Sequence, residues 1–127
     1  MMMMASVPTS VALYWLPYCS TCQKAKAYLE SKGLTITLTH DVKAQPLPLA
    51  TIVQLAEAVG GAEALFSKRA MKYRSLGLHE QELSPEALLN HMANEYTFIK
   101  RPMMVFDTGK TLCGFSTKAI DTLLTAG

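Results

Sequence analysis

The first forty residues switch between two hydrophobic periodicities, which predict a strand, a helix and a second strand. The apolar and aromatic run from Val11 to Leu16 ends at Pro17, which is typical of a buried strand stopped by a turn. The composition becomes helical from Thr21, and Gly33 is a stop signal at the carboxyl end of that helix. Apolar residues then alternate with threonine over 34–39, which predicts a strand parallel to the first. The predicted unit is βαβ.

The next part of the chain, about 41–98, is predicted to be a helical insertion. Apolar residues at helical spacing from Leu49 indicate an amphipathic helix, and the glycine pair at 60–61 ends it. Ser84 is a preferred helix cap and Pro85 a preferred first helical residue. A further helix is therefore expected to begin at this dipeptide.

The last part of the chain predicts two short strands and a helix. Met103–Phe106 and Thr111–Cys113 are the expected strands of an antiparallel hairpin, and a helix runs from about Thr117 to Leu124. The order βαβ, helical insertion, ββα is that of the thioredoxin-like fold, an α/β fold with a central mixed four-stranded sheet. We expect a single domain over 1–127, with a flexible N-terminal tail at 1–10.

Composition and charge narrow the classes of function. The chain has 127 residues, of which 50% are hydrophobic and 17% charged, so a mainly disordered protein is excluded. A net charge of +2 gives no general electrostatic case for direct nucleic-acid or membrane binding. No segment approaches the roughly 20 consecutive apolar residues of a membrane span. The N-terminus lacks the pattern of a secretory signal, so a cytoplasmic location is expected.

Three cysteines carry the most specific chemical signal. Cys19 and Cys22 form a Cys-x-x-Cys pair where the first strand passes into its helix. The N–H groups and dipole at a helix N-terminus stabilise a thiolate, so Cys19 is predicted to be the nucleophile. Cys22 follows one helical turn later and is predicted to resolve a mixed disulfide on Cys19 into a reversible internal disulfide. The third cysteine, Cys113, has no role that the sequence assigns.

Two other interpretations of the pair remain open. The cysteines could be buried apolar side chains, or half of a zinc site. Zinc needs two further ligands at suitable spacing, and Cys113 with the three isolated histidines does not form a second paired site. We therefore expect no metal and no cofactor.

Arg101 and Pro102 come directly before the predicted third strand. Proline cannot continue a ladder of hydrogen bonds, so at this position it indicates a turn or a cis peptide bond. In a thioredoxin arrangement the position faces the reactive cysteine, which makes Arg101 a candidate partner of a thiolate or a bound oxyanion and Pro102 a candidate substrate contact. The alternative is an ordinary surface arginine before a proline that begins a strand.

A basic run, comprising Lys68, Arg69, Lys72 and Arg74, lies within the insertion. If the run were helical, Lys68 and Lys72 would share one face, whereas Arg69 would be displaced by about 100°. The run is either a solvated face or a contact surface for an acidic partner. Direct readout of DNA is less favoured, since no helix-turn-helix turn or aromatic platform accompanies it.

The motifs together resemble the ArsC/Spx family of thioredoxin-fold proteins, from about Val11 to Leu124. The matching segments are YWLPYCSTCQKAKAYLE at 14–30, QPL at 45–47, SKR at 67–69 with YRSL at 73–76, and IKRP at 99–102. The family includes glutathione-linked arsenate reductases and the Spx redox regulators of RNA polymerase. The resemblance implies a thiol-disulfide redox function, with glutathione or the thioredoxin system as the reductant.

The two branches of the family imply different site residues. In the arsenate reductases a lone nucleophilic cysteine matches Cys19, but of the three arginines that cradle the oxyanion only Arg101 has a match. Ser67 and Gly114 stand at the other two positions. A doubly charged arsenate would lose charge-assisted hydrogen bonds of about 1.5 to 3 kcal/mol each, so arsenate reduction is the weaker alternative.

The Spx-like branch matches more closely. Its Cys-x-x-Cys switch corresponds to Cys19 and Cys22, and its switch-coupled arginine to Arg69. The glycine that meets the C-terminal domain of the RNA polymerase α-subunit corresponds to Gly61. Whether the chain is an enzyme or a redox-sensing regulator that binds RNA polymerase therefore stays open, and Lys68 is a further candidate anion contact.

Overall fold

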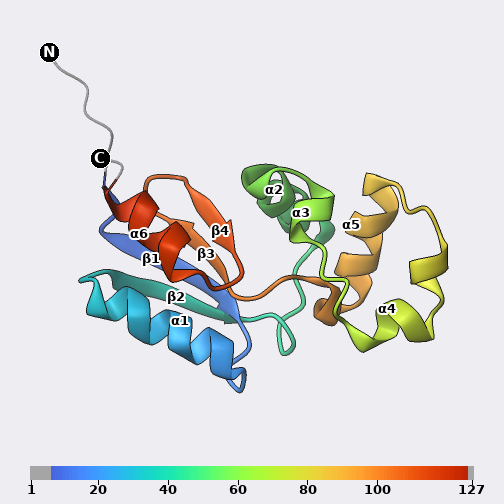
Figure 1. Ribbon diagram of the computed structural model, residues 1–127, viewed down its shortest axis with the longest axis horizontal. Helices are drawn as coiled ribbons and strands as arrows, with labels where there is room; N and C mark the ends of the chain where they lie inside the picture. The colour runs from blue at the N-terminus through green and yellow to red at the C-terminus, as the bar shows by residue number, and fades with distance from the viewer. Residues whose placement is uncertain (1–6, 126–127) are drawn as a thin grey trace, which may run out of the picture. The chain divides into compact units, whose positions relative to one another are not determined.

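The computed structural model describes residues 7–125, which fall into two compact units (Figure 1). Unit 1 contains the described residues up to Asp41 and from Arg101 onward, and unit 2 is Val42–Lys100. Residues 1–6 of the expected tail lie outside the described range. No helix within the described range is both long and apolar enough to cross a bilayer.

Unit 1 is a four-stranded mixed sheet with two helices. Strand β1 pairs in parallel with β2 and antiparallel with β3, and β4 pairs antiparallel with β3, giving the order β2-β1-β3-β4. The predicted parallel pair, hairpin and thioredoxin-like fold are confirmed. The elements are β1 (Ser10–Trp15), α1 (Ser20–Ser31), β2 (Thr35–Asp41), β3 (Met103–Phe106), β4 (Thr111–Cys113) and α6 (Thr117–Thr125).

Strand β2 departs from simple alternation at Thr37. Val11 of β1 lies opposite Ile36, but the next residue, Ala12, lies opposite Leu38. One additional residue on β2 is a bulge, and it exchanges the two faces for the residues that follow. Leu38 is consequently 45% exposed although the sequence pattern groups it with Ile36.

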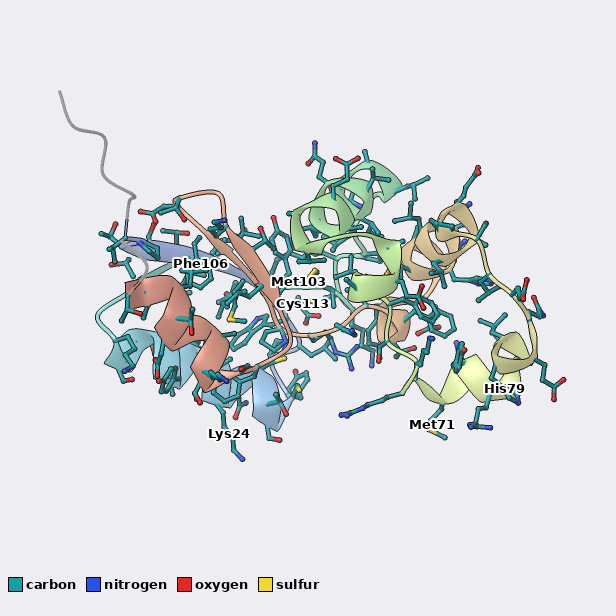
Figure 2. The ribbon with its side chains drawn as sticks, turned by 45° about the horizontal axis from the view of Figure 1, so that its top comes forward. Lys24, Met71, His79, Met103, Phe106 and Cys113 are labelled. Atoms are coloured by element: carbon teal, nitrogen blue, oxygen red, sulfur yellow. The ribbon has the colours of Figure 1, made fainter. Side chains whose placement is uncertain are left out.

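The hairpin aligns β3 with β4. Met103 lies opposite Cys113 in the register of these strands, and Figure 2 shows the two labelled side by side. The turn between the strands passes through Gly109, whose φ of 92° is a conformation that favours glycine. The predicted hairpin is therefore confirmed, with both strands at the expected residues.

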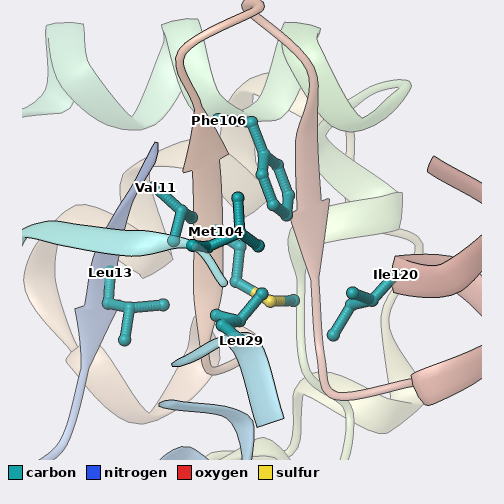
Figure 3. Close-up of a cluster of buried hydrophobic side chains, with 7 residues drawn as sticks. Val11, Leu13, Leu29, Met104, Phe106 and Ile120 are labelled. Carbon is teal, nitrogen blue, oxygen red and sulfur yellow. The ribbon is translucent and has the colours of Figure 1, made fainter. Parts of the chain in front are cut away.

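The core of unit 1 lies between the sheet and its helices. Alternate residues of β1 and β3 point toward Leu29 of α1 and Ile120 of α6, as Figure 3 shows. Asp121 of α6 also accepts a hydrogen bond from the Tyr28 hydroxyl and pairs with Lys32 at 3.4 Å, so polar contacts join the two helices. The buried cluster comprises Val11, Leu13, Leu29, Leu34, Met104, Phe106 and Ile120.

Unit 2 is a group of short helices. Gly60 has a φ of 108° and Gly61 a φ of 130°, so the glycine pair ends α2 as predicted. The Ser84 hydroxyl accepts a hydrogen bond from the N–H of Ala87 at 3.1 Å, which confirms the predicted cap of α5. The elements are α2 (Leu49–Val59), α3 (Ala62–Leu65), α4 (Met71–Ser75), η1 (Leu78–Glu80), α5 (Pro85–Asn94) and η2 (Tyr96–Phe98). Both η elements are short 3₁₀ helices.

Aromatic stacking and backbone bonds hold the centre of unit 2. The rings of Phe66 and Phe98 stack with centroids 5.0 Å apart, and both side chains are buried. The N–H of Ser67 donates to the carbonyl of Phe98 at 2.6 Å, and the N–H of Lys100 donates to that of Leu65 at 2.9 Å. These bonds fasten the segment after α3 to the segment after α5.

Candidate active site

Cys19 occupies the N-cap position of α1. Its N–H donates to the carbonyl of Leu16 at 3.0 Å, and its own carbonyl accepts from the N–H of Gln23 at 3.0 Å. The first bond closes a tight turn after β1, and the second is the first bond of the helix. Cys19 is partly exposed, in contrast to the buried Cys22.

The surroundings of Cys19 favour its thiolate. Partial burial opposes the charge, but the backbone N–H of Cys22, the Cys22 thiol, the backbone N–H of Thr21 and the charge of Arg101 outweigh it. Together they lower the pKa of Cys19 below its ordinary value. The two N–H groups belong to the first turn of α1 and have no partner within the helix, which is why they stabilise an anion there.

The surroundings of Cys22 favour its thiol. The side chain is fully buried, and burial together with the hydrogen bond and charge of Cys19 raises the pKa of Cys22 to about 11. A contact with the backbone of Leu16 and the charge of Arg101 only partly offset this rise. The two cysteines are therefore chemically distinct: one is ready to attack, and the other retains its proton.

Arg101 and Pro102 directly precede β3 in unit 1, and the charge of Arg101 acts on both cysteines. The positive charge of Arg101 lowers the pKa of both cysteines, and its Nε atom is shielded from solvent. The peptide bond between Arg101 and Pro102 is cis, the second of the two alternatives that the sequence left open. Pro102 is buried, and its carbonyl accepts from the N–H of Gly114 at 2.8 Å. This bond ties the start of β3 to the end of β4.

Cys113 is a third free thiol in unit 1. It lies in β4 and is partly exposed, and none of the three cysteines is in a disulfide in this structure. In the described part of the chain, no three His, Cys, Asp or Glu side chains are grouped as a metal site would require.

The remaining predicted site residues belong to unit 2. Lys68 pairs with Glu63 at 3.4 Å, and Arg69 is exposed. The helical arrangement considered for the basic run is wrong, because Lys68 and Arg69 lie in a turn and α4 begins only at Met71. Gly61 is the N-cap residue of α3, and a Cβ placed there would meet open space.

Sequence reasoning missed one residue that shapes the site. The side-chain amide of Gln23 donates to the carbonyl of Pro17 at 2.6 Å, bracing the turn that carries Cys19. The only signal was a polar residue one helical turn after the predicted cap. That signal is weak, because exposed polar residues are common in a first turn.

Comparisons with known proteins identify a family, similar sequences and a similar solved structure. The ArsC family model matches residues 14–123. The chain is 36% identical over 109 residues to the uncharacterized protein YusI of Bacillus subtilis (strain 168), a match that covers 84% of this chain and 91% of that protein. It is 28% identical over 96 residues to the global transcriptional regulator Spx of Lactiplantibacillus plantarum, covering 75% and 72% of the two chains. A solved arsenate reductase from Vibrio cholerae superposes with a TM-score of 0.76 at 23% identity, covering 94% and 99%, and shows the shared fold.

Proposed function

This chain belongs to the ArsC family, and on that premise we propose that it is a cytoplasmic thiol-disulfide redox protein with a reversible Cys19–Cys22 disulfide. The observation that carries the proposal is the contrast between the two thiols at the start of α1. The pKa of Cys19 is lowered, whereas that of Cys22 is raised to about 11. A thiolate is the attacking species in disulfide exchange, so the residues divide into a nucleophile and a resolving thiol.

The first step is attack of the Cys19 thiolate on a substrate disulfide. The substrate S–S bond breaks, a mixed disulfide forms on Cys19, and the first substrate sulfur leaves as a thiolate that takes a proton from water. Arg101 supports this step, since its charge favours the thiolate of Cys19 before the attack. The lost charge of Cys19 then changes the electrostatics of its neighbour.

The second step is the release by Cys22. The charge of Cys19 and its hydrogen bond to Cys22 both raise the pKa of Cys22. Both contributions disappear once Cys19 is in a mixed disulfide, whereas the charge of Arg101 remains. Cys22 therefore becomes more acidic at the stage that requires its thiolate. Its thiol loses a proton to solvent, and the resulting thiolate attacks the Cys19 sulfur, so that the mixed disulfide breaks and the second substrate sulfur leaves as a thiolate that takes up a proton. Glutathione or the thioredoxin system would return the disulfide to the reduced state, as the reducing cytoplasm does for exposed disulfides.

Mass spectrometry after exposure to glutathione disulfide tests this proposal. The Cys113→Ser background removes the third thiol from the measurement. In it the parent protein should lose two hydrogens and carry no adduct, whereas Cys22→Ser should accumulate one glutathione on Cys19. The Cys19→Ser variant should form neither species. Equal adduct formation with and without Cys19, or no internal disulfide in the parent, would refute the assigned roles.

A second candidate function is redox sensing through RNA polymerase, favoured by the similarity to Spx. In this function Gly61, at the start of α3, is the candidate contact for the C-terminal domain of the polymerase α-subunit. Arg69 is the candidate residue that couples the redox switch to binding, as the resemblance to the Spx-like branch implies. Biolayer interferometry with that purified domain tests it. Binding that depends on the oxidation state and is lost in Gly61→Arg would support the regulator, and absence of binding in both oxidation states would exclude it.

Arsenate reduction is the weaker alternative. Of the three positions that match the oxyanion-binding arginines of the arsenate reductases, only Arg101 is charged here, whereas Ser67 and Gly114 are neutral. A reduction assay with arsenate and glutathione would settle the matter, because turnover lost in Arg101→Met would establish this activity.

A further inference from the structure

The Tyr18 side chain is exposed directly beside the nucleophile. It is 94% exposed, whereas the other four tyrosines of the chain are all partly buried. Within residues 7–125, the side chain of Tyr18 makes no hydrogen bond, ring stacking or cation contact. A tyrosine ring carries a large apolar surface that gains free energy when it is covered.

The backbone that carries Tyr18 is nevertheless held in place. The N–H of Cys19 donates to the carbonyl of Leu16 at 3.0 Å, and the side chain of Gln23 donates to the carbonyl of Pro17 at 2.6 Å. Pro17 also fixes its own φ, so the turn on both sides of Tyr18 is restrained. A restrained aromatic residue loses little conformational entropy when a partner covers it, and this makes tyrosine an effective anchor.

The geometry of a mixed disulfide brings substrate backbone to this ring. Bonded cysteines have Cα atoms about 5.5 to 6 Å apart, and neighbouring residues along a chain have Cα atoms about 3.8 Å apart. Because Tyr18 directly precedes Cys19, these spacings allow a residue next to the substrate cysteine to contact the ring of Tyr18 when the substrate sulfur is bonded to Cys19. A small disulfide without side chains beside its sulfur leaves the ring uncovered.

From this placement we infer that Tyr18 is a substrate-specificity residue, and that the substrate is a disulfide within a polypeptide that has an apolar residue next to its cysteine. The inference rests on the proposed redox function and names the substrate class of the same site. The chemical step is the exchange described above: Cys19 and Cys22 give two electrons to the peptide disulfide, form their own disulfide and release two peptide thiols. A dithiol such as dithiothreitol then returns the protein to its reduced form.

The test compares two disulfides with dithiothreitol as the reductant. One is a disulfide-linked dimer of a short peptide with leucine beside its cysteine, and the other is hydroxyethyl disulfide. The measured quantity is selectivity, the ratio of kcat/KM for the peptide to kcat/KM for the small disulfide. Tyr18→Ala should lower this ratio about tenfold, mainly through a higher KM for the peptide, as expected for loss of an aromatic contact residue. Tyr18→Phe should keep the ratio, because the ring supplies the contact.

Controls separate this inference from the proposed function. Leu38→Ala removes another exposed apolar side chain of unit 1, 45% exposed, and should leave the ratio as in the parent protein. An unchanged ratio in Tyr18→Ala, with both disulfides still turned over, would overturn the role of Tyr18 and leave the redox function standing. If the parent protein reduces neither disulfide, both the redox function and this inference fail.

Discussion

Iodoacetamide near pH 7.5 should alkylate Cys19 at least about tenfold faster than Cys22 in the reduced protein. The pKa of Cys19 lies below its ordinary 9.0, while burial and the charge of Cys19 raise that of Cys22 to about 11. The two pKa values therefore differ by at least about two, which corresponds to a thiolate population at least about a hundredfold larger for Cys19.

Intrinsic nucleophilicity reduces part of this advantage. The more basic thiolate reacts faster. With a Brønsted coefficient of about 0.4 to 0.5, a pKa difference of about two makes the Cys22 thiolate about eightfold more reactive than the Cys19 thiolate. A rate ratio of about tenfold remains, and the complete burial of Cys22 increases it further.

Initial rates from peptide mapping between pH 6 and 9 measure this ratio. Initial rates are needed because alkylation of Cys19 removes the charge that raises the pKa of Cys22. A matched pair of variants tests the role of Arg101: Arg101→Met should raise the pH at which Cys19 reacts at half its maximal rate, and Arg101→Lys should raise it less. Equal rates for the two cysteines, or a half-maximal pH for Cys19 at or above 9.0, would refute this reasoning.

Two further predictions concern stability, measured by urea denaturation. Leu29→Ala should cost about 2 to 5 kcal/mol because Leu29 is fully buried, whereas Leu38→Ala, at a side chain 45% exposed, should cost less than about 1 kcal/mol; similar losses would contradict the assigned core. Glu95→Gln should cost about 1 kcal/mol at pH 7, since it weakens the contacts to Lys72 and Thr97. The hydrogen bond from Lys72 is the main cause that lowers the pKa of Glu95 from 4.5. The stability that it contributes is therefore fully present above pH 4.5 and is lost as the pH falls through the lowered pKa. If the free energy of unfolding of Glu95→Gln still differs from that of the parent protein by the same amount well below pH 4, this ion pair is not the cause.

Most of the secondary structure follows from local patterns along the chain. The alternation of apolar residues and threonine in β2 predicts a strand because side chains of a strand point to opposite faces with a period of two, and the continuous apolar run of β1 is typical of a buried strand. Ser84 marks the start of α5 for an equally local reason, since its hydroxyl accepts a bond from a residue three positions later. The short elements α3, α4, η1 and η2 have three to five residues, too few to show a helical period, and were not predicted individually.

Long-range contacts determine features that local patterns do not show. The bulge at Thr37 depends on the register between β1 and β2, so the exposure of Leu38 became evident only from the sheet. The turn at Lys68 likewise belongs to the backbone pairing in unit 2, where the N–H of Ser67 donates to Phe98.

The sequence by itself determined which residues form the candidate pair, since the spacing of Cys19 and Cys22 and the strand-to-helix transition can be read along the chain. It could not determine how far the two thiols differ. That difference arises chiefly from the complete burial of Cys22, which raises its pKa, and from the hydrogen bonds that Cys22 and Thr21 make to Cys19, which lower the pKa of Cys19. The sequence predicts Cys19 as the nucleophile, but desolvation acts through space, so only the tertiary structure decided how strongly the buried Cys22 retains its proton.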